Sequence, residues 1–197
     1  TAPRVPGGAA AAVLLLASCA TSPIVAPPRT APPAPSERAP GAAAEVLYRR
    51  GHLRFVSQKK PSAGHVLEVT QAVQIHAPAG RSAGEIVLIL SEWEALERLW
   101  VRVVDAKGDV SRVPAGALST EALTDSYMMS TGARRVRVHP SNVGVGAIVE
   151  MGYRVRSERP FDLPPWDVDG LYPLRESRLV VEVPEAFELG HGAVAGG

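Results

Sequence analysis

The residue types that carry catalytic chemistry are few in this 197-residue chain, and their spacing fits none of the common catalytic motifs. A nucleophilic cysteine could only be Cys19, the single cysteine, and no Gly-x-Ser-x-Gly elbow presents a serine. The five histidines follow none of the short spacings that bind a metal ion. They are His52, His65, His76, His139 and His191. We therefore expect exposed or capping histidines at strand ends and turns, no metal, no cofactor and no enzyme activity.

Cys19 lies at the end of a short apolar run, residues 9–17, which read AAAAVLLLA and follow Arg4. As a helix this run covers about 14 Å, about half of the hydrocarbon layer of a membrane, so it is too short to span and is typical of a secretory signal. Residues 16–19, LASC, resemble the lipobox of bacterial lipoproteins. The resemblance implies that residues 1–18 are a lipoprotein signal peptide and that Cys19 is lipidated. The alternatives are a plain signal peptide or a buried structural cysteine.

Several arginines and one tryptophan could bind a ligand. Arg135 and Arg137 alternate with valines, as do Arg154 and Arg156 with apolar residues. If the two segments pair as antiparallel strands, the four guanidinium groups share a solvent face and could grip carboxylates. The alternative is a solvated face that discourages aggregation. Trp166, between prolines and an aspartate, could dock a ligand or a neighbouring domain, but such a residue more often plugs the open end of a β-sandwich.

Composition divides the chain into a tether and a folded domain. Residues 19–44 contain seven prolines and no aromatic residue, so they cannot form a packed core and are predicted to be a Pro/Ala-rich tether behind the lipid. Residues 45–189 are long enough for one domain. Residues 190–197 would be a flexible tail or the start of a linker.

Alternation of apolar and polar residues dominates the region 45–189. It is clearest at residues 67–75 and 147–155, and it recurs at 134–139 and 178–183. This period of two predicts half-buried strands. We expect seven to nine strands and little helix, arranged as an antiparallel, immunoglobulin-like β-sandwich in an all-β fold.

Turns and one ambiguous segment complete the prediction. Residues 106–109, AKGD, favour a tight hairpin, and the proline-bearing residues 161–173 favour a long loop closing one end of the sheets. Ser91 and Glu94 have capping-box spacing, which favours a helical turn, yet Leu99, Val101 and Val103 have strand spacing. We favour a strand here because the downstream hairpin requires one.

The last fifty residues of the domain carry a family resemblance. Its elements are Pro140, Gly146, Ile148, Val149, Glu150, Tyr153, Pro160, Trp166, Pro173 and residues 177–179. This pattern is similar to a bacterial domain of unknown function found N-terminal to transglutaminase-like, papain-fold domains. The resemblance implies an immunoglobulin-like β-sandwich without catalysis of its own, and a catalytic transglutaminase-like domain usually follows it.

The charge balance narrows the class of partner. With 21 Lys+Arg against 20 Asp+Glu, the chain has no global field that would attract nucleic acid. We expect a lipid-anchored, non-catalytic module of the bacterial envelope. The resemblance to lipoproteins implies sorting to the outer membrane, facing the periplasm, because Ala20 and not Asp follows the cysteine. The module would contact the membrane through its lipid anchor. Its protein partner would be a transglutaminase-like domain or another envelope protein. The alternative function is a module that binds a cell-wall polymer or carbohydrate.

Overall fold

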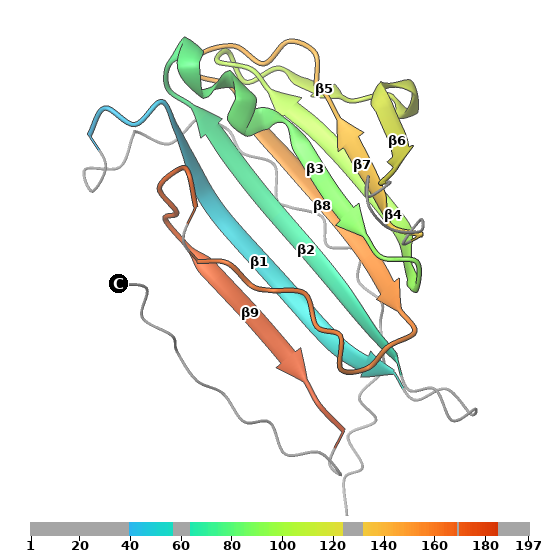
Figure 1. Ribbon diagram of the computed structural model, residues 1–197. Helices are drawn as coiled ribbons and strands as arrows, with labels where there is room; N and C mark the ends of the chain where they lie inside the picture. The colour runs from blue at the N-terminus through green and yellow to red at the C-terminus, as the bar shows by residue number, and fades with distance from the viewer. Residues whose placement is uncertain (1–39, 57–63, 124–131, 169, 185–197) are drawn as a thin grey trace, which may run out of the picture.

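The computed structural model describes residues 40–56, 64–123, 132–168 and 170–184, and within them nine strands form two stacked sheets (Figure 1). The strands are β1 (Ala44–Val56), β2 (Gly64–Ile75), β3 (Ile86–Leu90), β4 (Glu94–Val104), β5 (Val110–Arg112), β6 (Leu118–Ala122), β7 (Arg134–Val138), β8 (Ile148–Ser157) and β9 (Ser177–Glu182). Two short 3-10 helices, η1 (Pro78–Gly84) and η2 (Ala115–Ala117), join some of them. The chain is therefore an all-β sandwich, as its alternating sequence predicts.

The larger sheet has six strands in the order β5-β4-β8-β2-β1-β9, and the smaller has three in the order β3-β7-β6. Neighbouring strands run antiparallel except β1 and β9, which are parallel. A bulge between Val46 and Tyr48 in β1, and another between Leu96 and Arg98 in β4, shift the register of the large sheet. Such bulges bend a strand and increase its twist.

Alternate residues of the large sheet point into the sandwich. Val103 and Val149 pack against Ile86 and Val138 of the small sheet, and all four are nearly inaccessible to solvent. Farther along β8, Val155 contacts the cluster around Leu90 of β3. Because strand side chains alternate between faces, the intervening residues of β4 and β8 lie on the outer face of the large sheet.

The small sheet covers only part of this inner face, and the segment between β8 and β9 covers the rest. Residues 158–176 cross in front of β1 and β9 (Figure 1), and we call them the β8–β9 segment. Trp166 packs on the cluster of Leu53 and Leu67, and Tyr172 packs on that of Ile75. The predicted long loop is confirmed as a loop, and it is a structural layer of the sandwich.

The two local predictions for β4 are confirmed. Residues 94–104 form a strand, and the capping-box pair makes only a tight turn before it, in which the backbone N–H of Ser91 donates to Glu94 Oε2 at 2.8 Å. The hairpin to β5 turns at Gly108, whose φ of 95° favours glycine. Asp105 Oδ1 accepts backbone hydrogen bonds from Lys107 and Asp109 inside this turn.

Cys19, the signal and most of the tether lie outside the described residues, so the predicted lipidation and the predicted domain boundaries stay predictions. No helix within the described ranges is long and apolar enough to cross a membrane.

Candidate functional site

Trp166 is anchored to the large sheet. The edge of its six-membered ring lies directly on Gly51 of β1, where an added Cβ would be 2.6 Å from ring atom Cζ3. Its indole N–H donates a 2.9 Å hydrogen bond to the hydroxyl of Ser177, and the guanidinium carbon of Arg49 lies 4.9 Å from the ring centroid. A half-buried ring with its polar atom already bonded fits the role of a structural plug better than that of an exposed ligand platform.

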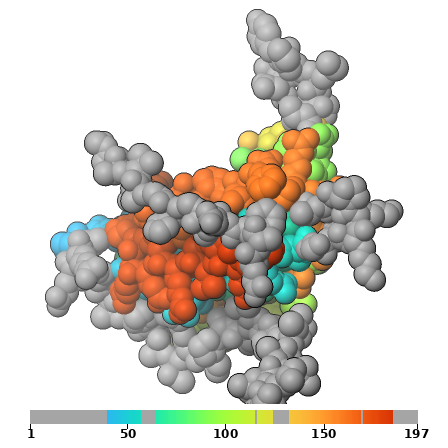
Figure 2. Space-filling model, turned by 90° about the horizontal axis from the view of Figure 1, so that it is seen from below, coloured from blue at the N-terminus to red at the C-terminus, as the bar shows by residue number. Residues whose placement is uncertain are grey.

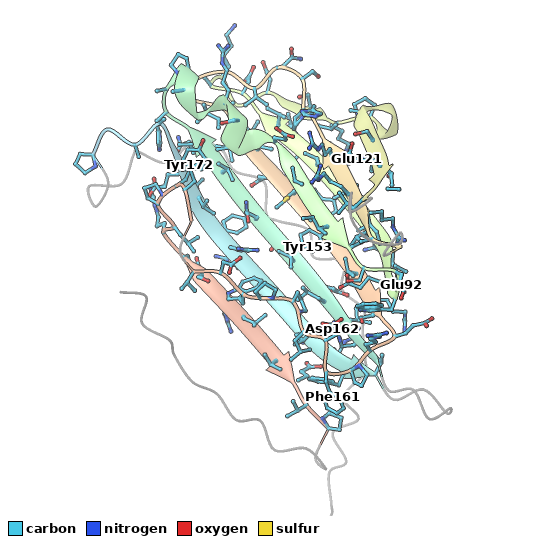
Figure 3. All side chains as sticks on the ribbon, in the orientation of Figure 1. Glu92, Glu121, Tyr153, Phe161, Asp162 and Tyr172 are labelled. Atoms are coloured by element: carbon cyan, nitrogen blue, oxygen red, sulfur yellow. The ribbon has the colours of Figure 1, made fainter. Side chains whose placement is uncertain are left out.

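A polar cluster lies beneath this tryptophan. Arg49 Nη1 donates to the backbone oxygen of Asp167 at 3.2 Å, which ties the β8–β9 segment to β1. Tyr153 of β8 lies over the middle of the sheet (Figure 3). Burial raises the pKa of the Tyr153 phenol, and the nearby positive charge of Arg49 opposes that rise. These groups bond to one another, so the cluster holds the segment in place.

The outer side of the β8–β9 segment carries large apolar side chains among acidic ones such as Asp162 and Asp167. Four of its large side chains are exposed, with exposed fractions of 77% for Phe161, 41% for Leu163, 58% for Val168 and 89% for Leu171. Figure 2 shows residues of the segment and β9, in the C-terminal colours, gathered on one face of the molecule. Exposed apolar groups of this size on an ordered segment mark interaction surfaces more often than chance.

The four predicted arginines do not share a face, because β7 and β8 lie in different sheets. Arg135 and Arg137 lie on the outer face of the small sheet, 2.8 and 3.6 Å from Glu121. Arg154 and Arg156 lie on the outer face of the large sheet, 2.8 and 2.5 Å from Glu97. Because β7 and β8 do not pair, the prediction that these four arginines share one carboxylate-binding face is wrong.

A different arrangement on the large sheet was missed by the sequence analysis. Arg98, Trp100 and Arg102 alternate along β4 on its outer face, and Arg102 lies opposite Arg112 of β5. This arrangement could have been predicted. If Leu99 and Val101 point inward from a strand, the alternating residues Arg98, Trp100 and Arg102 must lie on the opposite face. It was overlooked because Trp100 also fits the helical spacing.

Among the described residues, which exclude His191, no group of three or more potential ligands is close enough to hold a metal ion. His139 is exposed, as expected. His65 is not: it is 1% exposed and packs edge-on against Phe55, with ring centroids 6.4 Å apart. Its position opposite Phe55 and Ser157 on the inner face explains this burial.

Comparison with known proteins places the chain in a family. A family model described as a domain of unknown function with a solved structure, DUF3857, matches residues 61–196. The chain belongs to this family. The DUF3857 match covers every described strand after β1. A search of curated proteins finds no match.

Among solved structures, this DUF3857 chain is similar to a candidate protease from Parabacteroides distasonis, with a TM-score of 0.58 and 14% identity. The likeness covers 73% of this chain and 29% of that one, so the chain spans less than a third of that protein's length. At this identity the likeness shows the fold alone.

Two further likenesses are structurally too weak to support an inference. One is to a two-domain M1 zinc metallopeptidase, with a TM-score of 0.31 and 14% identity over 66% of this chain and 22% of that one. The other is to a CBM3a-L domain from a scaffoldin of Clostridium thermocellum, with a TM-score of 0.30 and 8% identity over 59% of this chain and 68% of that one.

Proposed function

We propose that this chain is a lipid-anchored, non-catalytic module of the bacterial envelope that docks a transglutaminase-like domain or another envelope protein. The observation that carries the proposal is the row of exposed apolar side chains on the β8–β9 segment, Leu171 above all. Trp166 and Tyr172 hold the two halves of this segment against the sheet. A pinned segment presents its apolar groups without a large loss of conformational entropy, which favours binding.

The path of the chain supports docking on this side. β8 ends at Ser157, which lies opposite His65, and β9 ends at Glu182, which lies opposite Arg54. Because Arg54 is next to Phe55, the partner of His65, the last residues of β8 and β9 lie at the same end of the large sheet. Phe161 is drawn beside the tip of β9 (Figure 3). A domain joined after β9 would first meet the start of the β8–β9 segment, and it would have to extend along the segment to reach Leu171, which precedes Tyr172 at the Ile75 end.

The likeness to the candidate protease supports an accessory role. There the same fold is one part of a longer protein, since it accounts for 29% of that chain. In the present chain the charged side chains near Trp166 and on β7 and β8 are used in ion pairs and hydrogen bonds. This arrangement favours a structural domain whose contribution is to hold a partner.

The anchor is tested by metabolic labelling with an alkyne analogue of palmitate. We expect label on the wild-type chain and none on a Cys19→Ser variant, because the thiol accepts the lipid. Equal labelling of both chains would contradict the anchor while leaving the docking surface untouched.

Docking is tested by titrating the chain with a purified transglutaminase-like domain from the same organism. A Leu171→Glu variant should bind about tenfold more weakly, since a charge would be desolvated in an apolar interface. Arg178→Glu, an exposed change on the outer face of β9, is the control and should bind as the wild type does. Equal affinity of all three would contradict docking through this segment.

A further inference from the structure

The outer face of the large sheet carries an aromatic platform. Trp100 of β4 lies opposite Gly152 of β8, and the Nε1–Cε2–Cζ2 edge of its indole lies directly against that glycine. An added Cβ on Gly152 would be 2.5 Å from Cε2 and 2.7 Å from Cζ2 of the ring. The Trp100 side chain is half-buried, so part of the ring faces solvent. Unlike Trp166, Trp100 has no hydrogen-bond acceptor for its indole N–H among the described residues.

Arginines surround this ring on both sides. Arg98 and Arg102 flank it along β4, two residues before and two after, and the guanidinium carbon of Arg102 lies 5.9 Å from the ring centroid. Arg112 lies directly opposite Arg102, and Arg154 lies directly opposite Arg98. Like charges placed directly opposite each other destabilise a sheet. Two such pairs stand beside one half-buried indole, and stability does not explain this concentration of charge. We call these five residues the Trp100 surface.

The carboxylates nearby neutralise only part of this charge. Arg102 is bound by Glu150, and Arg154 is bound by Glu97 at 2.8 Å and by Glu68 at 3.4 Å. Arg98 and Arg112, by contrast, are exposed and form no ion pair or hydrogen bond with any described residue.

We propose that the Trp100 surface binds a polysaccharide that carries carboxylate groups. The indole face accepts the apolar C–H face of a sugar ring, and Arg98 and Arg112 accept carboxylates through paired N–H groups. A membrane surface fits less well, because a half-buried indole packed against Gly152 does not protrude as a whole side chain to insert between lipids. Nucleic acid fits less well because the chain as a whole is nearly neutral.

This site is independent of the proposed docking function. The Trp100 surface lies on the outer face of the large sheet, whereas the β8–β9 segment covers the inner face. A chain could therefore hold a polymer on one side and a protein on the other.

The test is affinity electrophoresis of the full 197-residue chain in gels containing polygalacturonate or neutral dextran. We expect polygalacturonate alone to retard the wild-type chain, with an effect that weakens as salt is added. Trp100→Ala should weaken binding about tenfold, and Arg98→Ala and Arg112→Ala about threefold each. Trp100→Phe keeps a ring over Gly152 and should retain part of the binding, which separates loss of the platform from loss of folding.

Arg178→Ala is the matched control, because it removes the same charge from the same outer face at the opposite edge of the sheet. It should bind as the wild type does. Binding that falls equally in Arg178→Ala and Arg112→Ala would overturn the site, since it would report net charge alone. Unchanged binding by Trp100→Ala, or retention on phosphatidylglycerol vesicles but not on polygalacturonate, would also overturn it.

Discussion

Trp166 rests on the α-carbon of Gly51, so the β8–β9 segment reaches the sheet only because β1 has no side chain at that point. Gly51 lies on the inner face, between Val69 of β2 and Leu179 of β9 in the strand pairing. The contact joins residues more than a hundred positions apart and fixes the layer that carries the proposed docking surface.

Gly51→Ala should therefore destabilise the protein. The new methyl group would meet Trp166 and a Leu179 methyl at 2.6 to 2.8 Å, and we expect a loss of about 1 to 3 kcal/mol in the free energy of unfolding. Urea unfolding measures it. Gly144→Ala is the control, because no atom lies within 4 Å of its added Cβ. Equal unfolding midpoints for the two variants would show that the contact is absent.

Arg102 and Glu150 should be energetically coupled. Glu150 is fully buried and is bound by Arg102, with the Tyr48 hydroxyl 3.5 Å away. Removing only the arginine leaves a buried carboxylate, so Arg102→Met should cost about 3 kcal/mol, whereas Arg102→Met with Glu150→Gln should cost less. A double-mutant cycle by urea unfolding measures the coupling, and additive effects would contradict it.

Alkaline pH should destabilise the fold through Tyr153. Burial raises the pKa of this phenol in the folded chain above its value in the unfolded chain, with Arg49 opposing. The folded state then holds the proton more tightly, so the stabilisation is complete below about pH 10 and is lost as pH rises through the folded pKa. Unfolding midpoints between pH 8 and 11 should fall more steeply for the wild type than for Tyr153→Phe. Parallel curves would contradict the assignment.

Leu171→Glu should leave stability unchanged, which makes it a clean probe of docking. Its side chain is 89% exposed, and exposed substitutions change the free energy of unfolding by about 0.5 kcal/mol or less. Leu67→Ala, at a site only 7% exposed, should cost about 2 to 4 kcal/mol. A large loss of stability in Leu171→Glu would mean that the segment packs differently from the structure.

The strands could be predicted from sequence because alternation is a local property. The side chains of 67–75 and 147–155 repeat every two residues, and strands form there as predicted. The prediction that they are only half-buried is wrong, because Thr70, Gln74 and Glu150 on the opposite face are also buried. Which strands pair with one another is not a local property of the sequence. β7 and β8 are consecutive and joined by a short connection, yet they belong to different sheets, so a surface inferred from their pairing did not form.

The contacts of Trp166 and Trp100 could not be predicted from the sequence either. Each ring lies over a glycine of another strand, Gly51 and Gly152, and nothing in the local pattern indicates that either glycine faces a tryptophan. The distinction between a plug and a platform depends on whether the indole N–H is bonded, as it is by Ser177 for Trp166.

Photo-cross-linking in living bacteria tests the proposed function most directly. A benzophenone amino acid replaces Leu171 in one strain and Arg178 in another, and cross-linked products are identified by mass spectrometry. The account predicts that position 171 cross-links to one protein of the envelope, a transglutaminase-like protein or another, and that position 178 does not. Absence of any envelope protein from the products at 171, or equal yields at both positions, would contradict it.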